Sequence, residues 1–155
     1  MYKKILVPFD DSEPARHALA NALELVRGTD GEVCVLNVVE WRDYNAETFK
    51  IASRMSGVTG DSLDMGSISA LDVEAENEEV RRVSASIDDL VSEGDHVSIA
   101  VVNGSPHDSI VDYARDMDFD CITMGHRGMG VIRGMLGSVC YSVLQKSTVP
   151  VLVVK

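Results

Sequence analysis

Cysteine is scarce in this sequence. Only Cys34, Cys121 and Cys140 are present, and none of them belongs to a C-x-x-C pair. An odd number of widely spaced cysteines argues against a disulfide framework and against a zinc site. We therefore expect three free thiols that are buried or half-buried and pack as small apolar side chains.

Long hydrophobic runs are also absent, although hydrophobic residues make up 45% of the chain. A membrane-spanning helix needs about 20 consecutive apolar residues. The apolar run that follows Lys4 is too short even for the core of a signal peptide. Because 155 residues fit one domain of ordinary size, we expect a single-domain cytoplasmic protein that does not enter a membrane.

Acidic residues are missing from the last 35 residues of the chain. All 25 of them lie at or before Asp120, whereas residues 121–155 carry four basic side chains. The net charge of −11 disfavours nucleic acid and anionic membranes as partners. Two interpretations of the basic segment are open: an anion-binding site, or a mostly buried segment that lacks carboxylates for that reason. The acidic excess fits either a salt-adapted cytosol or ordinary solubility.

Short β-branched runs alternate with amphipathic segments along the chain. Strands are expected at 4–8, 33–39, 96–102, 119–124 and 149–154. Helices are expected after Ser12, over 71–93, after Ser105 and over about 137–147. Residues 41–70 are interpreted as a long, partly mobile excursion with a short helix near 45–55. This alternating order predicts an α/β fold with an open parallel sheet and helices on both faces.

Two helix starts carry recognisable capping residues. Ser12 is a good N-cap, and Pro14 falls in the first turn, where its missing N–H does no harm. Ser105 is followed by Pro106 and then by Asp108, a variant of the capping box.

Glycine is concentrated in residues 125–138, at positions 125, 128, 130, 134 and 137. Glycines let backbone N–H groups converge on an anion, and this segment follows a strand and precedes a helix N-terminus, the usual place of a phosphate site. Ser138 can add a hydroxyl, and Arg127 and Arg133 can add positive charge. The alternative interpretation is a flexible glycine hinge.

Asp10 comes directly after the first predicted strand. In open α/β sheets, ligands bind beyond the carboxyl ends of strands where the strand order reverses. If the first and fourth strands are neighbours, Asp10 faces the glycine segment, and its carboxylate could accept hydrogen bonds from ribose hydroxyls. The alternative is a solvent-facing acid beside Asp11.

Catalytic motifs are absent. The chain has no Walker sequence, no dinucleotide fingerprint after its first strand, no G-x-S-x-G and no H-E-x-x-H. Surface or packing roles are expected for the histidines, with His126 the one inside the glycine segment. We expect no catalytic residue, and slow ATP hydrolysis at most.

Five segments in this order resemble the universal stress protein family, and the resemblance covers nearly the whole chain. The segments are Lys4–Glu13, Leu36–Val39, Asn103–Pro106, Met124–Gly128 continued by Leu136–Val139, and Val149–Val154.

The resemblance implies a Rossmann-like sheet of order 3-2-1-4-5 and a homodimer that pairs the last strands, Val149–Val154, antiparallel. It implies that Asp10 holds the ribose, that the Val38 backbone meets adenine, and that Gly137 and Ser138 hold the phosphates of ATP with Mg²⁺ or Mn²⁺. The full set of expected nucleotide-binding residues is Pro8, Asp10, Val38, Met124, Gly125, Arg127, Gly128, Gly130, Gly137, Ser138 and Val139.

One spacing departs from the family pattern, in which nine residues separate G-x-x-G from G-[ST]. Here residues 129–136 give eight, and Gly130 and Gly134 are placed to absorb the difference. Three functions stay open: a regulatory ATP-binding module, a dimeric stress protein that does not hold ATP, and a slow ATPase or nucleotidyl transferase.

Overall fold

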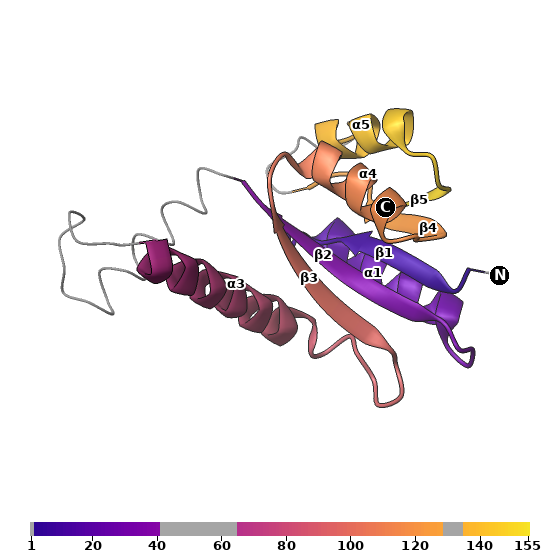
Figure 1. Cartoon of the computed structure of the whole chain (residues 1–155). Coiled ribbons are helices and arrows are strands. Elements are labelled where there is room, and N and C mark those ends of the chain that lie inside the picture. The colour runs from indigo at the N-terminus through magenta and orange to yellow at the C-terminus, as the bar shows by residue number, and fades with distance from the viewer. Residues whose placement is uncertain (1, 41–64, 129–134) are drawn as a thin grey trace.

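A five-stranded parallel sheet forms the centre of the molecule. The computed structural model describes residues 2–40, 65–128 and 135–155 (Figure 1). The strands are β1 (Lys4–Pro8), β2 (Glu32–Val39), β3 (Val97–Asn103), β4 (Cys121–Gly125) and β5 (Val151–Val154). Their order in the sheet is β3-β2-β1-β4-β5, with all four pairings parallel. Both the α/β fold class and the strand order are therefore confirmed.

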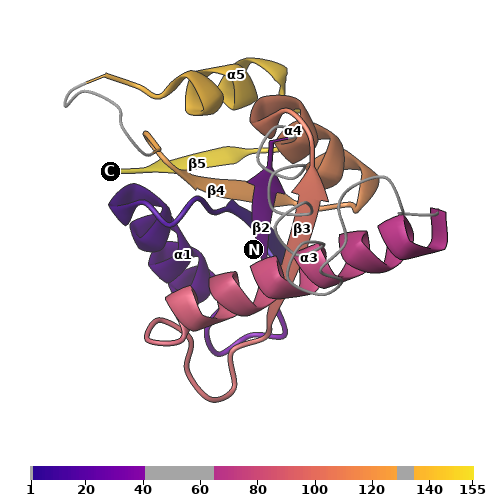
Figure 2. The same cartoon turned by 90° about the vertical axis from the view of Figure 1, so that its left-hand side faces the viewer.

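Four helices in the described residues cover the two faces of the sheet. They are α1 (Glu13–Val26), α3 (Met65–Ile87), α4 (Pro106–Asp116) and α5 (Ser138–Lys146). α1 and α3 lie on one face, and α4 and α5 lie on the other (Figure 2). The chain thus leaves β1 toward one face and β4 toward the opposite face.

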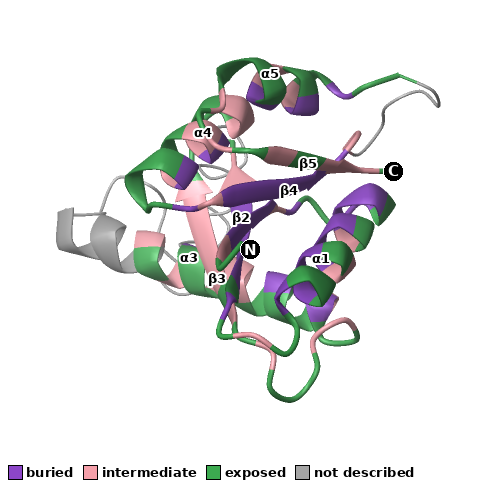
Figure 3. Ribbon diagram, turned by 90° about the vertical axis from the view of Figure 1, so that its right-hand side faces the viewer, coloured by how far each residue is buried: buried purple, intermediate pink, exposed green. Residues whose placement is uncertain are grey.

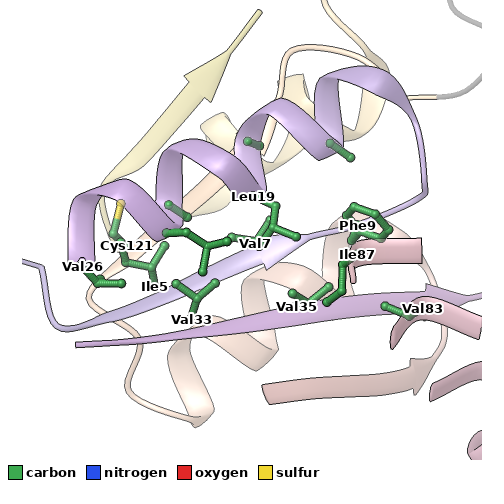
Figure 4. Packing of buried hydrophobic residues seen from close by; sticks show 14 residues of the cluster. Ile5, Val7, Phe9, Leu19, Val26, Val33, Val35, Val83, Ile87 and Cys121 are labelled. Carbon is green, nitrogen blue, oxygen red and sulfur yellow. The ribbon is translucent and has the colours of Figure 1, made fainter. Parts of the chain in front are cut away.

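Strand alternation builds a core on each face of the sheet, because successive side chains point to opposite sides. Ile5 and Val7 of β1 pack with α1 and with Val83 and Ile87 of α3 (Figure 4). Leu6, which lies between them in sequence, packs on the opposite face of the sheet with residues of α4 and α5. The central strands are accordingly buried and the outer helix faces exposed (Figure 3). Each such aliphatic side chain contributes about 1.5–3 kcal/mol by leaving water.

The start of α1 follows the sequence prediction. The Ser12 side chain accepts a hydrogen bond from the backbone N–H of Ala15 at 3.3 Å, and Pro14 lies in the first turn. Ser12 is confirmed as the N-cap, and it fixes the direction in which the chain leaves β1.

The predicted helix over 71–93 was wrong at both ends. α3 begins at Met65 and ends at Ile87, so the last part of the predicted 41–70 excursion is helical. The N–H groups of Leu90 and Val91 both bond to the carbonyl of Ile87, which closes the helix. Leu90 and Val91 still pack against the core, but from the turn, which explains their apolar character. Residues 41–64, with the expected short helix near 45–55, lie outside the described residues.

Val73 is an apolar residue of α3, but its side chain is 56% exposed. Among the α3 side chains that the structure describes, Ala75, Val83 and Ile87 are buried. Val73 lies 14 residues, about four turns, before Ile87 and so falls near the same side of the helix. Its exposure therefore follows from its place along α3 and not from the helical spacing.

The capping box predicted for α4 does not form. Ser105 is the N-cap residue and Pro106 begins the helix, but no side-chain cap bond is made there. The Asp108 carboxylate instead accepts a 2.7 Å bond from Lys146 of α5.

The three cysteines are free and buried, as predicted. Burial raises the pKa of the Cys34, Cys121 and Cys140 thiols. In the part of the chain that the structure describes, no helix is long and apolar enough to cross a membrane.

Candidate functional site

The carboxyl ends of β1 and β4 lie side by side, and the chain leaves them toward opposite faces of the sheet. This divergence is the topological switch point of a doubly wound fold, where ligands bind. Asp10 follows β1, and the glycine segment follows β4. The two features that the sequence singled out therefore meet at one edge.

Asp10 is held in a defined orientation at this edge. Its Oδ1 accepts hydrogen bonds from the Ser12 N–H at 3.1 Å and from the Ser12 hydroxyl at 2.6 Å. Its Oδ2 lies directly against Gly128, where any Cβ would collide with it. Gly128 is thus needed for the close approach of a carboxylate from β1 to the backbone after β4.

The two ends of the glycine segment are joined by backbone contacts. The N–H of Gly137 donates to the carbonyl of His126 at 2.8 Å. A Cβ on Gly137 would lie 3.0 Å from the Arg127 Cα, so these backbones touch. His126 is itself tied to β5, because its N–H donates to the Val154 carbonyl at 2.8 Å and its Nδ1 lies 3.2 Å from the same oxygen. The segment therefore returns to its starting point and presents α5 to the switch point.

The N-terminus of α5 is available to an anion. Gly137 is its N-cap residue, and among the described residues no side chain caps the helix. Ser138, the first helical residue, is exposed. The first N–H groups of a helix lack intrahelical partners and carry partial positive charge. An anionic group beside Ser138 would satisfy them.

The backbone of Val38 faces the opening between β1 and β2. The Leu36 carbonyl accepts from the Phe9 N–H at 2.8 Å, and the Val39 carbonyl accepts from the Gly104 N–H at 3.0 Å. Alternate residues of a parallel strand direct their backbone groups to alternate neighbours, so Val38, like Leu36, faces the β1 side. β1 ends at Pro8, and within residues 2–40 no backbone bond joins Val38 to Phe9.

A cleft of about 1120 Å³ opens over these strand ends. One wall is apolar and includes Leu36, Ile110 and Val139 from the α4 and α5 face. The other wall is charged and includes Glu79 and Arg82 of α3, which pair with each other.

Ten of the eleven predicted site residues line this cleft. They are Pro8, Asp10, Val38, Met124, Gly125, Arg127, Gly128, Gly137, Ser138 and Val139. The eleventh, Gly130, lies outside the described residues. The structure thus brings together positions that are spread over most of the chain.

Sequence reasoning missed Asn37 and the α3 wall. Asn37 is only 5% exposed and lines the cleft, and its Nδ2 donates to the carbonyl of Phe9 at 3.0 Å. Its Oδ1 is buried without a hydrogen-bond partner among the described residues, which costs about 1–3 kcal/mol. The sequence signal for Asn37 was a single amide side chain within the otherwise apolar run 33–39. The α3 residues gave none, because their place in the wall depends on long-range packing.

The chain matches the model of the universal stress protein family over residues 1–155. A curated relative, universal stress protein MJ0577 of Methanocaldococcus jannaschii, is 35% identical over 161 residues that cover 100% of this chain and 96% of the relative. The solved structure of the protein MJ0577 superimposes with a TM-score of 0.69 at 33% identity, covering 100% of this chain and 96% of that one.

A universal stress protein from Archaeoglobus fulgidus, solved in complex with dAMP, has the same fold, with a TM-score of 0.59 at 24% identity over 99% of this chain and 98% of that one. Another, solved in complex with cAMP, gives a TM-score of 0.60 at 19% identity over 99% and 96%. The strand order, the full-length family match and the identity to a curated member agree, and the chain belongs to the universal stress protein family.

Proposed function

We propose that this protein binds an adenine nucleotide in the cleft over β1 and β4 and acts as a regulatory stress-response module. The observation that carries the proposal is the Asp10 carboxylate against Gly128, at the switch point of the sheet. A carboxylate at this position accepts hydrogen bonds from ribose hydroxyls, and the missing side chain of Gly128 lets that carboxylate lie against the backbone that follows β4.

The cleft offers a different chemistry to each part of such a ligand. The Val38 backbone, which faces the opening between β1 and β2, and the apolar wall of the cleft suit the adenine ring. The uncapped N-terminus of α5 with Ser138 suits the phosphates. The Gly137 backbone lies against that of Arg127, where a side chain would be crowded, and so can approach a phosphate at the start of α5. We place Mg²⁺ or Mn²⁺ on the phosphate oxygens of bound ATP.

The comparisons support the ligand class. Two proteins of the same fold are described as complexes with dAMP and with cAMP, both adenine nucleotides. ATP is our specific proposal for this chain.

A second candidate is a dimeric stress protein that holds a nucleoside monophosphate or no nucleotide. The eight-residue spacing between Gly128 and Gly137 favours it, since a shorter segment narrows the room for a triphosphate. It shares with the first candidate the proposed homodimer through Val149–Val154. β5 is an edge strand with Leu152 39% exposed, and pairing with a second copy would cover that edge. We place either form in the cytoplasm.

A ligand titration separates the candidates. Purified protein, stripped of small molecules, is titrated with ATP, AMP, cAMP and GTP in the presence of Mg²⁺, and the small molecules released during stripping are identified by mass spectrometry. The proposal expects saturable ATP binding below millimolar concentration and weaker GTP binding. Saturation by AMP or cAMP but not ATP would favour the second candidate, and no saturable binding of any of the four would remove the nucleotide proposal.

A further inference from the structure

Asn37 occupies the point where β1 and β2 separate. The two strands are paired in register as far as Pro8 and Leu36, and the last backbone bond between them joins the Phe9 N–H to the Leu36 carbonyl. Continuing the ladder would bring the Val38 N–H to the Phe9 carbonyl. That carbonyl instead accepts the bond from Asn37 Nδ2 at 3.0 Å.

We infer that Asn37 is a positioning residue of the nucleotide site, whose side-chain amide takes the place of one ladder bond and so keeps the Val38 backbone open to the ligand. By holding Phe9, the same amide fixes the residue that precedes Asp10. One side chain thereby sets the separation between the groups that would meet adenine and ribose. This inference rests on the proposed function.

The burial of the Asn37 side chain supports a role for its Nδ2 donor. Asn37 is 5% exposed, and its Oδ1 is sealed from solvent and has no partner among the described residues. The hydrogen bond that the side chain does make runs through Nδ2 to the Phe9 carbonyl. An apolar residue at this position would avoid the unpaired oxygen, which makes the asparagine unfavourable for stability alone.

Replacing the Asn37 side chain should leave the melting temperature nearly unchanged or higher, but it should weaken nucleotide binding. In Asn37→Leu the Phe9 carbonyl is released and can accept the Val38 N–H, which extends the ladder by one bond. The unpaired Oδ1 also disappears. The melting temperature should therefore stay within about 4 °C of the wild type or rise. The adenine-binding backbone would be closed, and the dissociation constant for ATP should increase by about tenfold or more.

Amide hydrogen exchange separates a positioning role of Asn37 from a purely structural one. The two roles predict opposite changes in the exchange rate of the Val38 amide. The Val38 amide should exchange more slowly in Asn37→Leu than in the wild type, because it has gained a partner. Loosening of the strand end would make it exchange faster. Asn37→Val serves as a second variant in case the leucine side chain does not fit. Cys34→Ala is the matched control. Cys34 is also buried on β2, but its side chain packs in the core cluster on the α4 and α5 face of the sheet.

Weaker ATP binding together with an unchanged melting temperature and a slower Val38 amide would support the inference. Unchanged affinity in both variants would overturn it, and so would a faster Val38 amide with a fall in melting temperature. If the wild type binds no nucleotide, the proposed function fails. The exchange rate of Val38 without ligand then still decides whether Asn37 holds the ladder open.

Discussion

The Asp10 carboxylate occupies the space that a side chain on Gly128 would need. These residues are far apart in the sequence and meet because β1 and β4 are neighbours. The contact fixes the shape of the proposed ribose site from both sides. It also couples the two positions energetically, which can be measured without a ligand.

Gly128→Ala should destabilise the protein by about 1 kcal/mol, because the added methyl group displaces the exposed Asp10 carboxylate from its hydrogen bonds with Ser12. In an Asp10→Ala background the collision is gone, and the same substitution should have a much smaller effect. Denaturant unfolding of the wild type, both single variants and the double variant measures this coupling. Additive effects of the two substitutions would contradict the contact.

Ser138→Ala should weaken binding of ATP by about tenfold and leave binding of adenosine nearly unchanged. The hydroxyl stands at the first residue of α5, at the end of the cleft that we assign to phosphates. A charge-assisted hydrogen bond to a phosphate is worth about 1.5–3 kcal/mol. Calorimetric titration with both ligands checks the prediction, and an equal loss for ATP and adenosine would count against the assigned orientation.

Arg16→Ala should lower the melting temperature by about 2–4 °C. The Arg16 guanidinium donates to both carboxylate oxygens of Asp89, at 2.6 and 2.7 Å, and to the carbonyl of Ser86. It therefore joins α1 to the end of α3 and the turn after it.

Arg115→Ala is the control for that prediction, because Arg115 pairs with Asp112 and Asp116 close to it in sequence on α4. Thermal unfolding of both variants separates a bridge between elements from a local ion pair. Equal melting temperatures would show that the contact between α1 and α3 adds no stability.

The ion pairs of Asp89 and Asp108 should make stability depend on pH in the acid range. Hydrogen bonds from Arg16 and from Lys146 hold the pKa of these carboxyls below their ordinary value. A lowered folded-state pKa gives stability that is complete above the unfolded pKa of about 3.9 and is lost as the pH falls through the folded pKa. Asp108→Asn and Asp89→Asn should therefore reduce the melting temperature at neutral pH, and the difference should shrink as the pH falls below the unfolded pKa and through the lowered folded-state pKa. A difference that stays constant with pH would contradict this assignment.

The fold could be predicted from the sequence because local signals agreed. The strands are continuous apolar runs, as parallel strands covered on both faces require, and Ser12 caps a helix with an apolar face at helical spacing. The bounds of α3 could not be predicted in the same way. Gly66 and the surrounding serines indicate a loop, while Leu90 and Val91 continue the apolar pattern past the end of the helix and pack from a turn.

The candidate site was predictable in its positions but not in its contacts. Asp10 and the glycine segment stand out by residue type, and the strand order implied by the family resemblance brings them together. The collision between Gly128 and Asp10 and the bond from Asn37 to Phe9 depend on where strands separate, and no sequence pattern encodes that. The charged wall from α3 depends on packing of Val83 and Ile87 against the sheet.

The most direct test of the account is the affinity for ATP with Mg²⁺ of Asp10→Asn beside that of Asp11→Asn. Asp11 is the matched control because it is the adjacent carboxylate and has a φ of 64°, which asparagine adopts readily. The account predicts that Asp10→Asn raises the dissociation constant by about tenfold or more, while Asp11→Asn stays within about twofold of the wild type. Equal affinity of the wild type and Asp10→Asn would contradict the central claim that this carboxylate holds the nucleotide.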